Sequence, residues 1–171
     1  MTFRIFFTLL CVSIGSLPLT TCSGGYSFTG GDVGEAKTFS VDRFPNNAPL
    51  VNPNLSQFLT EAIKDIFLQQ TNLRLVDDDD GDFHISGSIV EYRIAPMAPT
   101  AAQTAAQSRL TIAIQVQFEN RLEPKKSYEE RFSRFADFDA EASFSSIEET
   151  LMRQINLELA ENVLNRAIVN W

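Results

Sequence analysis

The sequence predicts an α+β domain, a two-layer sandwich in which two helices cover one face of an antiparallel sheet of about four strands. Three observations predict this fold class. The elements follow the order strand, helix, several strands, helix. Residues 55–67 have the periodicity of an amphipathic helix, and residues 110–118 alternate between apolar and polar. The chain has 171 residues, 44% of them hydrophobic and 21% charged, which suits one such domain.

The first residues have the layout of an exported lipoprotein. Arg4 supplies a positive charge, and the apolar stretch 5–19 is too short and too interrupted for a spanning helix, which needs about 20 apolar residues. Leu19-Thr20-Thr21-Cys22 is similar to a lipobox, whose cysteine becomes the lipidated first residue. A buried cysteine behind an ordinary cleavage site is the alternative. The expected organisation is a signal peptide (1–21), a flexible tether (22–34) that starts at the lipidation site Cys22, and a single α+β domain (35–171).

The first half of the domain contains the clearest helix. Phe39 and Val41 alternate with polar residues and indicate a short strand, after which 44–52 breaks regular structure with two prolines and three asparagines. Asn52-Pro53 suits the start of a helix. One face of that helix is continuously apolar and must lie on a sheet or another helix: Leu55, Phe58, Leu59, Ala62, Ile63, Ile66 and Phe67.

A short strand at 73–76 leads into the acidic turn 77–82. Read as an EF-hand with its glycine at Gly81, this turn would place Val76 at the first ligand position and Gly87 at the last. Neither residue has a side-chain carboxylate. A solvated turn is therefore the better interpretation.

Two strands and a loop follow the acidic turn. Residues 83–95 form a long strand with Gly87 as a candidate bulge. Residues 96–108 consist mostly of Ala, Gln, Thr and Pro and are expected to be a long loop. The alternation of 110–118 gives the next strand one core face and one polar face.

The last two elements are a strand and a helix. In the strand 128–138 the phenylalanines depart from strict alternation, which indicates a bulge near Ser133. Two overlapping capping boxes, one from Ser145 and one from Ser146, predict the start of the final helix. Its inner stripe is expected to consist of Ile147, Leu151, Ile155, Leu159 and Val163.

Charge and residue inventory argue against several functions. Removing residues 1–21 takes away one base, Arg4, and no acid, so the mature net charge is −9, which argues against nucleic acid as a partner. No cysteine is left after Cys22 is lipidated, and no Gly-rich phosphate loop or metal-ligand spacing appears. His84 is interpreted as a structural or surface residue. We therefore expect no enzymatic activity, no cofactor and no metal.

Two polar features favour a binding role. The polar side of strand 110–118, which includes Gln115 and Gln117, suits the polar interior of an outer-membrane barrel; a plain solvated face is the alternative. The loop 96–108 is small-residued and nearly uncharged, which suits close packing on a partner; disorder is the alternative. The candidate partner contacts are Pro96, Gln103, Gln107, Gln115 and Gln117.

Several stretches resemble the LPS-assembly lipoprotein family, the LptE-like proteins of diderm bacteria. They are residues 39–53, the helix through Phe67, the strand 108–112 and the segment 132–138. With the lipobox and the terminal helix, the likeness covers nearly the whole mature chain. It implies two helices on a four-stranded sheet. It also implies an outer-membrane lipoprotein, on the periplasmic face, that plugs and helps assemble the β-barrel translocon for lipopolysaccharide.

The resemblance also raises direct contact with lipopolysaccharide through basic residues. The candidates are the bases nearest the strand ends: Arg93, Arg109, Arg121, Lys125 and Lys126. Ordinary surface charge is the alternative for each, because a mature charge of −9 opposes broad binding of a phosphate-rich ligand. The alternative function is a free lipoprotein that carries or shields a lipid, which would need an apolar cavity between sheet and helices.

Overall fold

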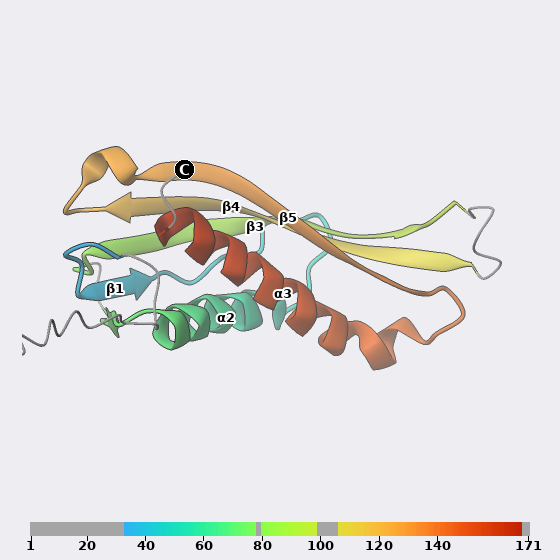
Figure 1. The fold of residues 1–171 in the computed structure, drawn as a ribbon. Coiled ribbons are helices and arrows are strands. Elements are labelled where there is room, and N and C mark those ends of the chain that lie inside the picture. The colour runs from blue at the N-terminus through green and yellow to red at the C-terminus, as the bar shows by residue number, and fades with distance from the viewer. Residues whose placement is uncertain (1–32, 78–79, 99–105, 169–171) are drawn as a thin grey trace, which may run out of the picture.

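Five strands form one sheet, and both helices lie on the same face of it (Figure 1). The computed structural model describes residues 33–77, 80–98 and 106–168, so the predicted signal peptide, Cys22 and Gln103 lie outside the described residues. The predicted fold class is confirmed. The elements are β1 (Thr38–Val41), α2 (Leu55–Gln70), β2 (Arg74–Leu75), β3 (Phe83–Pro96), β4 (Gln107–Asn120), the 3₁₀ turn η1 (Pro124–Lys126), β5 (Tyr128–Asp139) and α3 (Phe144–Ile168).

The sheet is mixed rather than antiparallel, and it has five strands rather than about four. Its strand order is β2-β1-β3-β4-β5. Strand β1 pairs in parallel with both β2 and β3, and only β3, β4 and β5 are antiparallel neighbours. Helix α2 carries the chain back between β1 and β2, and strands joined by such a crossover lie parallel. The four residues of β1 and the two of β2 are too few for periodicity to show their direction.

Helix α2 begins at Leu55, two residues later than predicted. Asn52 closes the turn before the helix instead, because its Oδ1 accepts a hydrogen bond from the backbone N–H of Asn54 at 2.9 Å. The ring of Phe67 stacks on that of Phe39 in β1, with 5.4 Å between centroids. The predicted inner face is confirmed for the buried residues Leu55, Leu59, Ile63, Ile66 and Phe67.

The bulge in β3 lies between Ile89 and Glu91 and not at Gly87, where the sequence predicted it. Gly87 is paired regularly with Val116. A Cβ atom on Gly87 would overlap the backbone of β4 and lie 2.7 Å from the Phe44 ring, so this glycine allows a close approach of two segments. The bulge changes which side chains face the helices. Ile89 and Glu91 therefore lie on opposite faces of the sheet.

The predicted bulge near Ser133 is wrong. Pairing between β4 and β5 is continuous, without a register shift, over the whole length of β5. The phenylalanines depart from alternation for a different reason. Phe132 and Phe138 pack against the core, whereas Phe135 lies on the opposite face and is 49% exposed.

The connection between β3 and β4 is shorter than the predicted loop 96–108. Pro96 pairs with Ser108, and Gln107 pairs with Asp139 of β5, so the two ends of the predicted loop belong to strands. Residues 99–105 lie outside the described ranges. β3 and β4 extend beyond both helices at this end of the sheet (Figure 1). Strand pairing therefore continues beyond the residues whose apolar pattern predicted the two strands.

Helix α3 begins at Phe144, so neither predicted capping box forms. Ser145 and Ser146 lie inside the first turn of the helix. Glu148 is used for tertiary contacts instead. Its Oε1 accepts hydrogen bonds from the hydroxyl of Tyr92 at 2.5 Å and from Nδ2 of Asn52 at 2.8 Å. Burial and this carboxylate raise the pKa of Tyr92, which therefore stays a donor at neutral pH.

One apolar core lies between the sheet and the two helices. The expected core residues Phe58 and Leu151 are partly buried at its margin. The predicted apolar helix faces are fully buried at Ile63, Phe67 and Ile155, and the predicted core face of strand 110–118 is fully buried at Ile112, Ile114 and Val116. The inner stripe of α3 is buried from Met152 to Leu164, and it includes one polar residue, Asn156.

Asn156→Leu is expected to raise the free energy of unfolding by about 1–3 kcal/mol. Asn156 is 1% exposed, and neither polar atom of its amide has a hydrogen-bond partner among the described residues. Urea unfolding of the mature chain measures the effect. Asn162→Leu is the matched control on the same helix and should give no gain, because the Asn162 amide is bonded to Arg134 and Glu158. No gain for Asn156→Leu would mean that bound water satisfies the amide.

Candidate partner-binding face

The sheet has a face that none of the described helices covers (Figure 1). We call it the outer face. The alternating side chains of β4 that point away from the helices carry it, together with their neighbours on β3 and β5. These residues are Ser86, Ser88, Glu91, Arg93, Arg109, Thr111, Ala113, Gln115, Gln117, Glu119, Glu129, Arg131, Ser133, Phe135 and Asp137.

Glu91 is the centre of a charged network on the outer face. Its two carboxylate oxygens accept from Nε of Arg93 at 2.9 Å and from Nη2 of Arg131 at 2.6 Å. Arg131 belongs to β5, so its side chain crosses β4 to reach β3. Ala113 of β4 lies between Glu91 and Ser133 in the pairing and is fully buried although it is on the outer face. A small residue there leaves room for the crossing arginine.

Arg109 is held in place by two contacts on the neighbouring strand. Its Nε and Nη2 donate to the two carboxylate oxygens of Asp137 at 2.6 and 2.8 Å. Its guanidinium lies 3.6 Å from the centroid of the Phe135 ring. The hydrogen bonds from Arg109 lower the pKa of Asp137, so this pair stays charged at neutral pH. Aromatic residues and arginine are each enriched in protein–protein interfaces relative to the rest of the surface.

Gln115 and Gln117, two predicted contact residues, lie on the outer face near the middle of β4. Nε2 of Gln115 donates to Glu129 on β5 at 3.2 Å. Gln117 is exposed and pairs with Ser86 on one side and Glu129 on the other. This part of the outer face is therefore polar and carries amide side chains, in contrast to the arginine-rich part.

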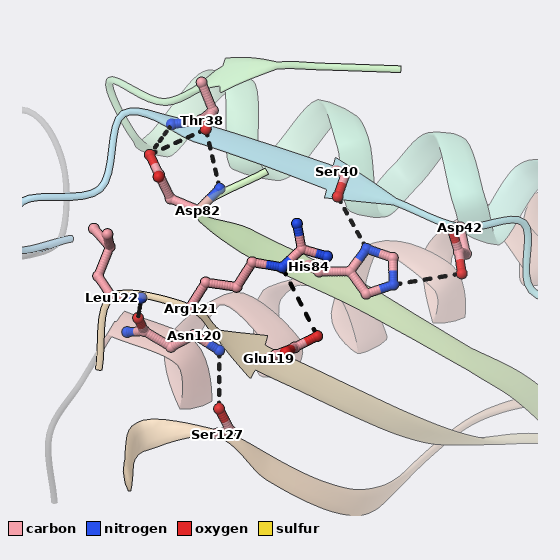
Figure 2. A network of polar contacts seen from close by, with 10 residues as sticks. All are labelled: Thr38, Ser40, Asp42, Asp82, His84, Glu119, Asn120, Arg121, Leu122 and Ser127. Atoms are coloured by element: carbon pink, nitrogen blue, oxygen red, sulfur yellow. Dashed lines mark hydrogen bonds and ion pairs between the residues drawn. The ribbon is translucent and has the colours of Figure 1, made fainter. Parts of the chain in front are cut away.

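Asp82 connects the acidic turn before β3 to β1 through hydrogen bonds (Figure 2). Its Oδ2 accepts from the backbone N–H groups of Lys37 and Thr38 at 2.8 and 3.0 Å, and from the Thr38 hydroxyl at 3.0 Å. The hydrogen bond from Lys37 is the main reason why the pKa of Asp82 is lowered. The ionised Asp82 carboxylate therefore stabilises the fold at neutral pH, and this stabilisation is lost as the pH falls through the lowered pKa of Asp82. Asp82 has a structural role.

His84 lies beside Ser40 and Asp42, a trio that combines the residue types of a hydrolase triad (Figure 2). Nδ1 of His84 lies 2.9 Å from Oγ of Ser40, and Nε2 lies 3.5 Å from Oδ2 of Asp42. Ser40 is only 3% exposed, so a substrate has no direct access to its hydroxyl. These contacts join β1 to β3. His84 is therefore interpreted as structural, as the sequence suggested.

The structure divides the five basic candidates between the two ends of the sheet. Arg93 and Arg109 lie near the end where β3 leads to β4. Arg121, Lys125 and Lys126 lie near the opposite end, in and before η1. Twelve residues of extended strand separate Arg109 from Arg121, a distance of roughly 40 Å. The five do not form one cluster.

The remaining predicted contacts lie at the arginine end. Pro96 is exposed and Gln107 is half-buried, and both belong to paired strands. Sequence reasoning missed Glu91, Arg131 and Phe135. The off-alternation position of Phe135 in β5 was the one signal for the outer-face aromatic, and it was read as a bulge.

Several chemistries are missing from the part of the chain that the structure describes. No group of three or more His, Cys, Asp or Glu in that part could hold a metal ion. Neither α2 nor α3 combines the length and hydropathy needed to cross a lipid bilayer. Hollows beside α2, of about 580 and 350 Å³, are lined by surface residues rather than by the core between sheet and helices. These hollows therefore do not have the position that an acyl-chain carrier would need.

The described residues thus form a well-packed α+β scaffold that presents a polar, arginine-containing sheet face. A family model described as lipopolysaccharide-assembly, LptE, matches residues 36–167. The chain belongs to this family. No curated protein gives a significant match.

Solved structures share the fold at low sequence identity. A minor lipoprotein from Acinetobacter baumannii is 15% identical, with a TM-score of 0.51, over 77% of this chain and 91% of that one. A rare lipoprotein B from Shewanella oneidensis is 12% identical, with a TM-score of 0.50, over 75% and 92%. A hypothetical protein from Chlamydia trachomatis is 11% identical, with a TM-score of 0.51, over 79% and 99%.

Proposed function

We propose that this protein is an outer-membrane lipoprotein, anchored by lipid on Cys22 and facing the periplasm. It docks inside the β-barrel translocon that inserts lipopolysaccharide at the cell surface, and it acts there as a plug and an assembly aid. The family match over residues 36–167 carries this proposal. The similarity to proteins called lipoproteins in Acinetobacter and Shewanella supports the anchor.

The outer face supports docking in a polar environment. It lacks a helical cover among the described elements and combines amide, hydroxyl and paired charged groups. The interior wall of a large outer-membrane barrel is polar as well. Specific interfaces bury about 1,200–2,000 Å², and a domain surrounded by its barrel should exceed that area.

Direct contact with lipopolysaccharide belongs to the proposal only for Arg93 and Arg109. They lie at the same end of the sheet, and Arg93 is largely exposed although it is paired with Glu91. Arg121, Lys125 and Lys126 lie too far away to share a headgroup with them. Purification of the lipidated protein from detergent-solubilised outer membranes tests the proposal. The barrel translocon should be its main partner, and its absence would contradict the proposed function.

Cys22→Ser should release the protein from membranes while leaving the domain folded. The predicted anchor is the lipid on this cysteine, and a serine hydroxyl cannot accept that lipid through a thioether. Membrane fractionation and intact-mass analysis measure the effect. A Cys22→Ser variant that stays on the membrane, or an unmodified Cys22 in the wild type, would show that the anchor is misassigned.

A further inference from the structure

A groove lies among the described residues on the helical side of the sheet, opposite the outer face. Two hollows, of about 580 and 350 Å³, share Arg43 as a lining residue and follow the first three turns of α2. We call them together the α2 groove. It is lined by Arg43, Pro45, Asn46, Val51, Asn52, Pro53, Ser56, Gln57, Thr60, Glu61 and Lys64.

One hollow of the α2 groove is lined by two bases, Arg43 and Lys64, and by one acid, Glu61. Eight of the described bases form an ion pair with an Asp or Glu at an N–O distance of at most 4.0 Å: Arg93, Arg109, Arg121, Lys126, Arg131, Arg134, Arg153 and Arg166. Arg43 and Lys64 form no such pair with a described residue, and both line the same hollow. In a mature chain of net charge −9, a hollow whose lining has more bases than acids favours a negatively charged occupant.

Arg43 forms one hydrogen bond with the described residues, through Nε. Its Nε donates to Oγ of Ser56 at 3.2 Å, and Oγ of Ser56 in turn donates to the carbonyl oxygen of Phe44. The terminal nitrogens of Arg43 have no partner among the described residues. The groove thus offers donors that an occupant with carboxylate and carbonyl oxygens would satisfy.

The occupant that fits these features is an extended polypeptide rather than a phosphate group. Each hollow has room for on the order of ten water molecules, far more than one phosphate fills. Glu61 lies in the second hollow with Arg43 and Lys64, so its lining has a net charge of +1, which suits a single carboxylate better than a phosphate-rich headgroup. At the other end Val51 is 62% exposed, and its neighbour Leu50 is also exposed, so the rim offers apolar contacts for side chains.

We propose that the α2 groove holds an extended, carboxylate-bearing segment of the barrel partner, with Arg43 and Lys64 as its charge contacts. This inference rests on the proposed function. A domain surrounded by its barrel meets the barrel chain on both faces, and the outer face and the α2 groove lie on opposite sides of the sheet. The contact is electrostatic in part and weakens as ionic strength rises.

The test is the double variant Arg43→Gln, Lys64→Gln in the full, lipidated chain. Its matched control is Lys37→Gln, Arg74→Gln, which removes two bases that also lack an ion pair among the described residues and that do not line the groove. On purification from outer membranes, the groove variant should retain less barrel than the control by a factor of at least about ten. A photo-crosslinker at Gln57 should attach to a barrel peptide that contains Asp or Glu.

Four outcomes decide the matter. Wild type without the barrel overturns the proposed function and this inference together. Wild type and control with the barrel, and a groove variant that retains it equally, overturn the inference alone. The third outcome comes from calorimetric titration of the lipidated protein with inorganic phosphate. If phosphate binds and Arg43→Gln abolishes that binding, the groove is a phosphate site instead. Loss of the barrel only in the groove variant, with no phosphate binding and the Gln57 crosslink, supports it.

Discussion

The double variant Gln115→Arg, Gln117→Arg is expected to lower the amount of barrel translocon that co-purifies with the protein at least about tenfold. Both glutamines lie in the middle of the outer face, on adjacent outward positions of β4. In the proposed complex this part of the face is desolvated. Two guanidinium groups placed there would lose their hydration, and Glu129, which lies opposite position 117, could pair with only one of them. The isolated protein should tolerate both arginines because the face is open to water.

Gln69→Arg with Gln70→Arg is the matched control for this variant. It makes the same substitutions at two exposed, adjacent glutamines at the end of α2, away from the outer face. Co-purification of the barrel is compared for both variants, together with thermal melting of each. Equal retention of the barrel by both variants would place the docking surface elsewhere. If Arg93→Ala or Arg109→Ala alone then abolished function, direct contact with lipopolysaccharide would be the better account.

Ile114→Ala is expected to lower the free energy of unfolding by about 2–5 kcal/mol. Ile114 is fully buried, and it pairs with Ile89 of β3 on one side and Phe132 of β5 on the other. The alanine would leave a cavity in the middle of the sheet, where the flanking strands cannot collapse without losing their hydrogen bonds. The midpoint of urea unfolding of the mature chain measures the loss.

Gln117→Ala is the control for this substitution, three residues along the same strand on the outer face. It should change stability by no more than about 0.5 kcal/mol, as exposed positions usually do. A loss below about 1 kcal/mol for Ile114→Ala would show that the core repacks around the alanine. The difference between the two substitutions thus measures how strictly the inner face of β4 is specified.

Local periodicity predicted the elements that are long and bury one side. The helix at α2 and the alternation in β4 were predicted with the correct inner faces, since burial on one side imposes a repeat on neighbouring residues. Helix boundaries were predicted less well. Asn52 and Glu148 have the residue types of caps, but they bond to each other across the fold, and no local pattern indicates a partner 96 residues away.

The candidate site was predicted only in part. Gln115, Gln117, Arg93 and Arg109 lie on the outer face, as a binding role requires. The partners that fix the arginines were not predicted, because Glu91 reaches the outer face only through the bulge that follows Ile89. Arg121, Lys125 and Lys126 looked equivalent to Arg93 in the sequence. In the structure these three bases lie at the opposite end of β4 from Arg93.

The sequence by itself determined the fold class and the inner faces of α2 and β4, and it predicts an export signal that ends at Cys22. Each of these depends on residues close together in the chain. Only the tertiary structure decided the parallel pairing of β1, the pairing of Arg131 with Glu91 and the α2 groove at Arg43. These features join segments far apart in sequence, and their geometry is set by strand register and bulges. A shift of one residue in register would move every side chain of a strand to the other face.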